Sequence, residues 1–309
     1  MQLPRASDVL VRRLAVASVV ANAGIVVTGG IVRLTGSGLG CPTWPTCTAD
    51  SLTPTAAYAQ HGAIEFTNRM LTFVLTAVAV ATLLAVLRSD RRDLTRFAVA
   101  AFLGIPAQAV LGGITVLTGL NPWTVAAHFL LSMVILAITT TMASRAYQPP
   151  GPARVVVNPS LVTLVRVLLG VTAAVLVLGT VVTGSGPHAG DVDVPRTGFD
   201  PETVSQLHAD AVMLLLGLTV ATWLWLRGSK APPAATRAAA VLLAVELAQG
   251  VVGFVQYFTG LPVAVVGLHL LGACLVWIAA LRLLLATTTR EPAPAPDPVA
   301  RITEEYVAG

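Results

Sequence analysis

The feature that most constrains this chain is a series of long apolar runs separated by short polar segments. A helix needs about 17–25 residues to cross a bilayer, and eight runs meet that length. Of the 309 residues, 55% are apolar and 11% are charged, which excludes a soluble domain of this length. We therefore expect an all-α integral membrane protein. The eight predicted spans are residues 14–32, 69–87, 97–118, 123–143, 161–183, 207–226, 238–259 and 263–286.

Basic residues gather before the first span and in every second connection, which by the positive-inside rule places both termini in the cytoplasm. Connections 33–68 and 184–206 then face outward across the cell membrane. Residues 1–13 read as a cytoplasmic start with no cleaved signal peptide, 146–160 as a cytoplasmic linker, and 287–309 as a disordered cytoplasmic tail. Membrane topology accounts for the net charge of +4, so no nucleic-acid partner is expected.

The chain also contains an internal repeat. AQAVLGGITVLTGLNPWTVAAHFL at 107–130 aligns without gaps on AQGVVGFVQYFTGLPVAVVGLHLL at 248–271, with ten of 24 positions identical. VVTG recurs as well, at 26–29 and 181–184. Four spans return a chain to its starting side. Residues 14–145 and 161–286 are therefore predicted to be two four-helix bundles of one design, parallel repeats related by an axis along the membrane normal.

Histidines occupy corresponding places in the two halves. His208 and His269 fall at similar depths below the outer surface, His128 matches His269 in the repeat, and Asn68 matches His208. Ionisable side chains within a span are costly and usually functional, although a hydrogen bond between helices is the plainer alternative. Neutral imidazoles that face each other across a bundle suit axial ligation of a haem. Zinc suits the set less, because no cysteine or carboxylate completes a tetrahedron at that depth.

Several motifs together resemble the haem A synthase family. They are GGIVRLTGSGLGCPTWPTC at 29–47, IEFTNR at 64–69, TGSGPHAGD at 183–191 and the two half-repeats, and the resemblance covers residues 12 to about 286. It implies an eight-helix oxidoreductase that converts the C8 methyl of haem O to a formyl group, giving haem A for terminal oxidases. It also implies a haem b cofactor on His208 and His269, and a haem O substrate on His128. Contacts with haem O synthase and an electron acceptor, and a homo-oligomer, are left open.

The chain departs from the family at one position. The family motif on the second span is E-x-x-H-R, whereas Glu65-Phe-Thr-Asn68-Arg69 has asparagine in place of histidine. Asparagine is a poor iron ligand. Either His128 holds the substrate iron from one side alone, or another residue takes the vacant place. His61, four residues before Glu65 and on its helical face if the helix begins early, is the first candidate, and His188 is a second.

Glu65, Asn68 and Arg69 share one face of a helix, because residues at i, i+3 and i+4 are neighbours. On the resemblance we predict Glu65 as the catalytic carboxylate, which stabilises positive charge at the oxidised carbon or accepts its proton. The alternative is a glutamate favoured by the dipole at the helix start. Arg33 and Arg69 lie at helix ends near the sites, where guanidinium groups pair with haem propionates.

Two cysteines stand in the first outer connection. Cys41 and Cys47 lie on the oxidising side with two prolines between them, so a disulfide is geometrically plausible. Two free thiols and, less readily, a two-ligand metal site are the alternatives. The family resemblance implies a disulfide that lies as a lid over the substrate half. So short a ring gains little from loop-closure entropy, which favours a positional or redox role.

Other polar groups within the spans have plainer predicted roles. Gln108, Gln249 and Glu246 are expected to bridge helices through hydrogen bonds, and Cys274 to be a small buried apolar side chain.

Two other classes of function remain open beside the enzyme. The first is a di-haem electron-transfer protein, which needs paired ligands in both halves, and Asn68 argues against it. The second is a transporter, and transporters of this kind usually break their helices at mid-membrane. Here the polar groups cluster near the outer surface instead, so the enzyme ranks first and the transporter last.

Overall fold

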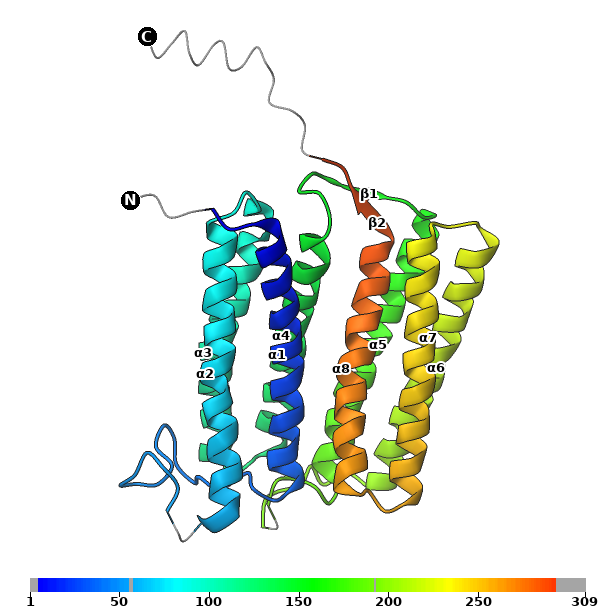
Figure 1. Ribbon diagram of the computed structural model, residues 1–309. Helices are drawn as coiled ribbons and strands as arrows, with labels where there is room; N and C mark the ends of the chain where they lie inside the picture. The colour runs from blue at the N-terminus through cyan, green and yellow to red at the C-terminus, as the bar shows by residue number, and fades with distance from the viewer. Residues whose placement is uncertain (1–4, 56–57, 192, 293–309) are drawn as a thin grey trace, which may run out of the picture.

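The computed structural model describes residues 5–55, 58–191 and 193–292 (Figure 1). Within these ranges, eight helices are long and apolar enough to cross a membrane, which confirms the predicted all-α integral membrane fold. The elements are α1 (Asp8–Leu34), α2 (Ala59–Leu87), η2 (Arg92–Leu94), α3 (Thr95–Leu117), α4 (Pro122–Ala146), β1 (Ala153–Val155), α5 (Pro159–Ser185), α6 (Pro201–Gly228), α7 (Pro233–Phe258), α8 (Val263–Ala286) and β2 (Thr288–Arg290).

The helices form two four-helix bundles that stand side by side (Figure 1). In the N-terminal bundle α1 packs on α2 and α4, and α3 packs on α2 and α4; in the C-terminal bundle α5 packs on α6 and α8, and α7 packs on α6 and α8. Helices α2 and α4, and likewise α6 and α8, therefore occupy opposite corners of their bundles. The two bundles meet through α1, α4, α5 and α8.

The two ends of the molecule differ. At one end lie the described parts of the connections 35–58 and 186–200, and at the other the strands β1 and β2 (Figure 1). We call these the disulfide end and the strand end. Helix α1 begins and α8 ends at the strand end, as eight spans require.

The same turn closes α3 and α7. Each helix is followed by Thr-Gly-Leu, in which the last two residues have positive φ: 61° and 56° at Gly119 and Leu120, 75° and 61° at Gly260 and Leu261. The leucine N–H reaches back to the carbonyl of Thr115 in one copy and of Gln256 in the other, which is the 6→1 bond of a Schellman motif. The backbone thus repeats the sequence.

Four helices, α1, α2, α6 and α7, start at least five residues before their predicted apolar runs. Helix α2 starts at Ala59 instead of residue 69, and α6 starts at Pro201 instead of residue 207. Both added segments are polar and therefore fall outside a hydropathy window. At α6 the side chain of Asp200 accepts a hydrogen bond from the Thr203 N–H and Pro201 takes the first turn, a start signal that is independent of hydropathy.

The strand end holds a short antiparallel pair that the sequence does not indicate. Strand β2 (Thr288–Arg290) pairs with β1 (Ala153–Val155), so the predicted disordered tail 287–309 is corrected at its start. Arg290 donates to the Gly151 carbonyl over 2.7 Å. The remainder of the predicted tail, 293–309, lies outside the described residues.

A packed apolar layer joins the two bundles. Cys274 is fully buried in a cluster with Val26, Met133, Leu136 and Leu176, which come from both halves. This placement confirms Cys274 as a small buried apolar side chain. Because this layer lies between the bundles, each bundle keeps a separate interior in which a site can form.

Candidate functional site

Three imidazoles lie inside the bundles at matching depths. His128 on α4, His208 on α6 and His269 on α8 each fall six or seven residues after the first residue of their helix, which is about 10 Å from the helix start. The Nδ1 atom of each ring is buried, and no hydrogen-bond partner for it exists in the described part of the chain. Buried polar atoms without partners are rare, and they point to a ligand or functional role.

Each of these rings lies against a glycine on a neighbouring helix. A Cβ atom at Gly112, Gly179 or Gly253 would lie 3.1, 3.3 or 3.4 Å from the Cε1 atom of His128, His208 or His269 respectively. A Cβ would crowd the rings of His128 and His208 and would be in van der Waals contact with the ring of His269. The three glycines therefore hold three imidazoles in equivalent places, two in the C-terminal bundle and one in the N-terminal bundle.

In the C-terminal bundle, His208 and His269 come from opposite corners. Helices α6 and α8 both pack on α5 and α7, and their histidines fall seven and six residues after the helix starts. Gln249 fixes the backbone of α8 at this level, because its Nε2 donates to the His269 carbonyl over 2.9 Å. The structure thus brings together the pair that the sequence singles out.

In the N-terminal bundle, the same corners hold His128 and Asn68. Gln108 repeats the bond of Gln249: its Nε2 donates to the His128 carbonyl over 3.1 Å, and also to Ser132 Oγ over 2.8 Å. The Asn68 Oδ1 is buried and has no partner among the described residues. Gly24 on α1 corresponds to Gly179 in the VVTG register, and a Cβ there would meet no described atom within 4 Å. No described side chain lies against Gly24 as the His208 ring lies against Gly179.

The cysteine pair at the disulfide end is confirmed as a disulfide. Cys41 and Cys47 are joined, with their Cα atoms 4.3 Å apart, and their exposed fractions are 0% and 1%. The bond is therefore shielded from solvent in this conformation, inside a loop that folds over the N-terminal bundle.

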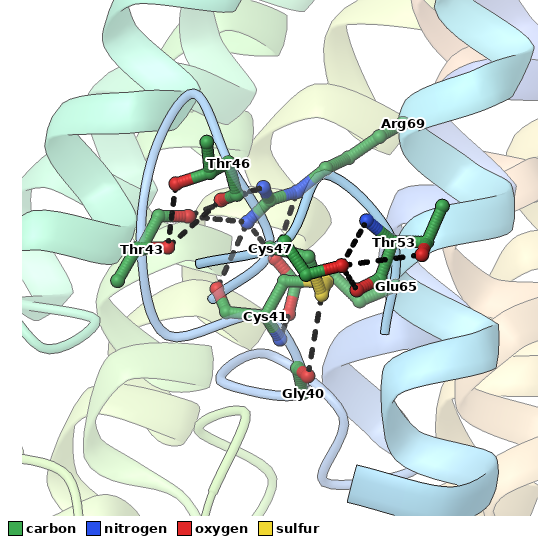
Figure 2. Close-up of a disulfide and its surroundings, with 9 residues drawn as sticks. Gly40, Cys41, Thr43, Thr46, Cys47, Thr53, Glu65 and Arg69 are labelled. Carbon is green, nitrogen blue, oxygen red and sulfur yellow. Dashed lines mark hydrogen bonds and ion pairs between the residues drawn. A yellow bond between two sulfur atoms is a disulfide. The ribbon is translucent and has the colours of Figure 1, made fainter. Parts of the chain in front are cut away.

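Glu65 and Arg69 tie α2 to this loop (Figure 2). The Arg69 guanidinium donates to Glu65 Oε1 over 2.6 Å and to the carbonyls of Cys41, Thr43 and Thr46 over 2.9–3.2 Å. The other Glu65 oxygen, Oε2, accepts from the Cys41 N–H over 2.7 Å. The i, i+4 ion pair confirms that both residues share one helical face, and the side chain of Arg69 is directed into the loop.

Trp44, at the tip of the loop, packs on α3. A Cβ atom at Gly113 would lie only 2.5 Å from Cδ2 of the indole, so the ring occupies the place of a side chain. The preceding residue, Gly112, faces the His128 ring. In the second copy the corresponding residue is Phe254, which is 58% exposed. The disulfide loop thus has a seat in the N-terminal bundle that the C-terminal bundle does not offer.

His61 lies in the first turn of α2, and its Nδ1 shares a 2.9 Å hydrogen bond with Ser37 Oγ. Its side chain is exposed, while Ser37 is fully buried. His61 precedes Asn68 by two helical turns, about 10 Å along the axis. Because α2 starts early, His61 lies on the same helical face as Glu65, as predicted. It is, however, beside the disulfide loop and not at the depth of Asn68.

Arg33 and His188 link the two halves at the disulfide end. The Arg33 guanidinium donates to the carbonyls of His188 and Thr183 over 2.7 and 2.8 Å. His188 Nε2 lies 2.9 Å from the Leu261 carbonyl. Both side chains thus contact backbone of the C-terminal half, and the role of Arg33 toward a propionate stays a prediction.

Comparison with known families decides the affiliation. The COX15-CtaA family model, described as "Cytochrome oxidase assembly protein", matches residues 12–281. This chain belongs to that family. The match covers both bundles and both candidate sites.

The individual relatives share less than a third of the aligned residues with this chain. A protein of Listeria welshimeri named "Heme A synthase" is 29% identical over 127 residues, 40% of this chain and 41% of the relative. One of Geobacillus thermodenitrificans with the same name is 30% identical over 134 residues, 42% and 41% of the two chains. One of Halalkalibacterium halodurans is 26% identical over 214 residues, 65% and 71%. The first of these matches spans about two fifths of the relative's length.

The donor set of this family member fits a haem better than a metal ion alone. In the described ranges no group of three or more His, Cys, Asp or Glu side chains is placed to hold a metal ion. His208 and His269 instead supply two imidazoles with unpartnered Nδ1 atoms from opposite corners. Two imidazoles that come from helices at opposite corners of one bundle are a donor set that a haem iron takes.

Sequence reasoning missed two parts of the site. The contact of Trp44 with Gly113 could have been suspected from the repeat, because Gly113 aligns with Phe254 and so leaves room for another side chain. The bonds from Arg69 to three loop carbonyls have none, because they depend on the path of an irregular loop.

Proposed function

We propose that this protein is a haem A synthase, an oxidoreductase that converts the C8 methyl of haem O to a formyl group for a terminal oxidase. Its family membership and the names of its relatives support this proposal. The observation that carries it is the asymmetry of the two bundles. One interior offers two imidazoles from opposite corners, and the other offers an imidazole opposite an asparagine. Such a difference suits one resident haem and one haem that must enter and leave.

The C-terminal bundle would hold the resident haem b, with His208 and His269 as axial ligands. When bound, the haem supplies one-electron chemistry at its iron. The protein's own part is to fix both rings, which Gly179 and Gly253 confine from the neighbouring helices, and to keep water out of the bundle interior.

The N-terminal bundle would receive haem O. His128 would bind the substrate iron, with its ring held by Gly112 and its backbone by Gln108. Asn68 opposite is a weak ligand, so the substrate iron would be held firmly from one side only. That arrangement favours release of the product.

Glu65 would act as a fixed negative charge at this site. Arg69 and the Cys41 N–H engage its two oxygens, so neither oxygen can take up a proton from substrate without giving up one of these contacts. Of the two predicted roles, stabilisation of positive charge at the oxidised carbon is the one that this geometry favours. The same contacts make Glu65 an anchor of the disulfide loop, while Arg69 would pair with propionates only by giving up part of that anchor.

The proposed setting is the plasma membrane, with both termini in the cytoplasm and the disulfide end outside. Haem O is the proposed substrate. A haem O synthase and an electron acceptor are proposed as the partners that supply the substrate and remove electrons.

Replacing Glu65 by Gln tests the proposal. Glutamine keeps an acceptor for the Cys41 N–H but removes the charge. We expect the variant to keep its bound haem spectrum and its disulfide while haem A production from haem O collapses. Glu202→Gln, at an exposed carboxylate of α6, is the matched control and should produce haem A normally. Haem A production at the wild-type rate by the Glu65 variant would contradict this role, and a wild-type protein that binds haem but never converts haem O would contradict the enzyme.

A further inference from the structure

One carboxyl group inside the C-terminal bundle is not used by the proposed chemistry. Glu246 lies near the middle of α7 and is 7% exposed. Thr219 Oγ1 on α6 donates to its Oε1 over 2.9 Å, which confirms the predicted helix bridge. Its Oε2 is buried and has no partner within the described residues. A carboxylate at mid-membrane costs several kcal/mol, about 3 on insertion scales, so its presence needs a reason.

The N-terminal bundle shows that packing of the helices does not require a carboxyl group at this position. In the repeat register Glu246 corresponds to Ile105, and Thr219 corresponds to Ala79. Ile105 and Ala79 belong to one packed apolar cluster with Leu75. The same helix pair therefore packs with apolar side chains at this level. The polar pair of the second copy is not required to hold α6 against α7.

Glu246 lies on the interior face of α7, below the histidine pair. Gln249, which bonds the His269 carbonyl, follows it by three residues, and Gly253, which faces the His269 ring, follows by seven. Residues at these spacings share a helical face. Glu246 is thus about 10 Å from the level of the ring along the helix, on the strand-end side of the histidines.

Among the described residues, Glu246 has no ion-pair partner. Helix α7 packs on α6 and α8, and none of the ionisable residues of these three helices forms an ion pair with Glu246 in the described structure. His208 and His269 lie in the same bundle on α6 and α8, and in the proposed holoprotein both are iron ligands. The ionisable residues of the three helices are Glu202, His208, Asp210, Arg227, Arg237, Tyr257, His269, Cys274 and Arg282.

We propose that Glu246 is a redox-linked proton site, which binds a proton when the haem between His208 and His269 gains an electron and releases it when that haem is oxidised. This inference rests on the proposed haem b cofactor. A ferric haem with two neutral imidazoles carries one positive charge on its core, and reduction removes that charge. The positive charge that favours the ionised carboxylate then disappears, and a proton from water takes its place. The electron comes from a one-electron donor, and charge in the interior stays balanced.

Two measurements on the purified full-length protein test this proposal. Infrared difference spectra between the dithionite-reduced and oxidised protein should show the carbonyl band of a protonated carboxyl on reduction, and Glu246→Gln should abolish it. The midpoint potential of the haem should fall with rising pH in the wild type, toward the limit of about 59 mV per pH unit for one proton per electron. In the variant it should be independent of pH.

A double variant guards against failure of the single one to fold. Thr219→Ala with Glu246→Ile installs the apolar pair of the N-terminal bundle, and it should keep the haem spectrum while losing both proton signals. Both signals unchanged in both variants would overturn the proton site and leave the haem assignment intact. A wild-type protein that holds no haem would overturn the proposed cofactor, and the redox linkage with it.

Discussion

The two bundles of this protein are copies of one frame with different interiors. Both keep a glutamine bonded to a histidine carbonyl, a glycine against the histidine ring, and a Schellman turn after the third helix of the copy. These shared features fix the helices and the depth of the ring. They are the part of the design that does not depend on which molecule each bundle receives.

The differences lie at four places, and each has a physical consequence. The second imidazole of the C-terminal copy corresponds to an asparagine in the N-terminal copy, its buried carboxyl corresponds to an isoleucine, and its phenylalanine corresponds to a glycine. In the described structure, only the N-terminal copy carries a disulfide loop. Under the proposed function, the C-terminal interior would keep its haem, and the N-terminal interior would admit one beneath the disulfide loop. The pairs are His208 and Asn68, Glu246 and Ile105, and Phe254 and Gly113.

The largest expected loss of stability follows from removing Arg69, which has Ala209 at its place in the second copy. Arg69→Ala would leave Glu65 buried without a cation and three loop carbonyls without a donor. Removing one partner of a buried ion pair typically costs about 3–5 kcal/mol. We expect a clear fall in the thermal unfolding temperature in detergent and faster proteolysis between residues 41 and 47.

The exposed pair of Arg5 and Asp90 at the strand end provides the control. Its side chains are 82% exposed, and such pairs contribute about 0–1 kcal/mol. Arg5→Ala should leave the unfolding temperature nearly unchanged. Equal effects of the Arg5 and Arg69 substitutions would contradict the proposed anchoring of the loop.

A smaller effect is expected from giving the first copy the residue of the second. Gly113→Phe places a side chain where the Trp44 indole lies, and overpacking of this kind costs about 1–3 kcal/mol. We expect the loop to leave its seat, so that Cys41 and Cys47 become accessible to reductant and are reduced faster than in the wild type. Phe254→Gly, at the exposed counterpart, should not change that rate. An unchanged rate in the Gly113 variant would mean that Trp44 does not hold the lid.

The smallest change in stability is expected from a substitution at Asn68. Asn68→His restores the imidazole of the second copy, and no described side chain lies against Gly24. We expect stability within about 1 kcal/mol of the wild type, as for tolerated replacements of similar volume, but slower release of haem from the N-terminal bundle. Release to apomyoglobin, followed by absorption, measures this. Release at the wild-type rate would contradict a one-sided hold on the substrate iron.

Much of this frame can be predicted from the sequence, because its physical causes are periodic. Apolar runs fix the eight spans, and the repeat predicts the parallel bundles and the matched depth of His128 and His269. The pairing of Cys41 with Cys47 follows from their closeness in an outward loop and from the family resemblance.

The parts that could not be predicted depend on irregular or long-range geometry. The first residues of α2 and α6 are polar and carry no hydropathy signal. Of these two helices, only α6 has a capping residue, Asp200, that indicates where it begins. The bonds of Arg69 to loop carbonyls and the seat of Trp44 depend on how the loop folds back. Strand β2 exists only because β1 lies beside it, so a window over residues 287–292 alone sees a polar tail.

The measurement that most directly tests the division into a resident and an admitting bundle is the absorption spectrum of the purified protein with one histidine replaced at a time. We predict that His208→Ala and His269→Ala each abolish the low-spin spectrum of the bound haem. His128→Ala should keep that spectrum while haem A production is lost. A low-spin haem that persists in both the His208 and His269 variants, or that disappears only in the His128 variant, would contradict the account.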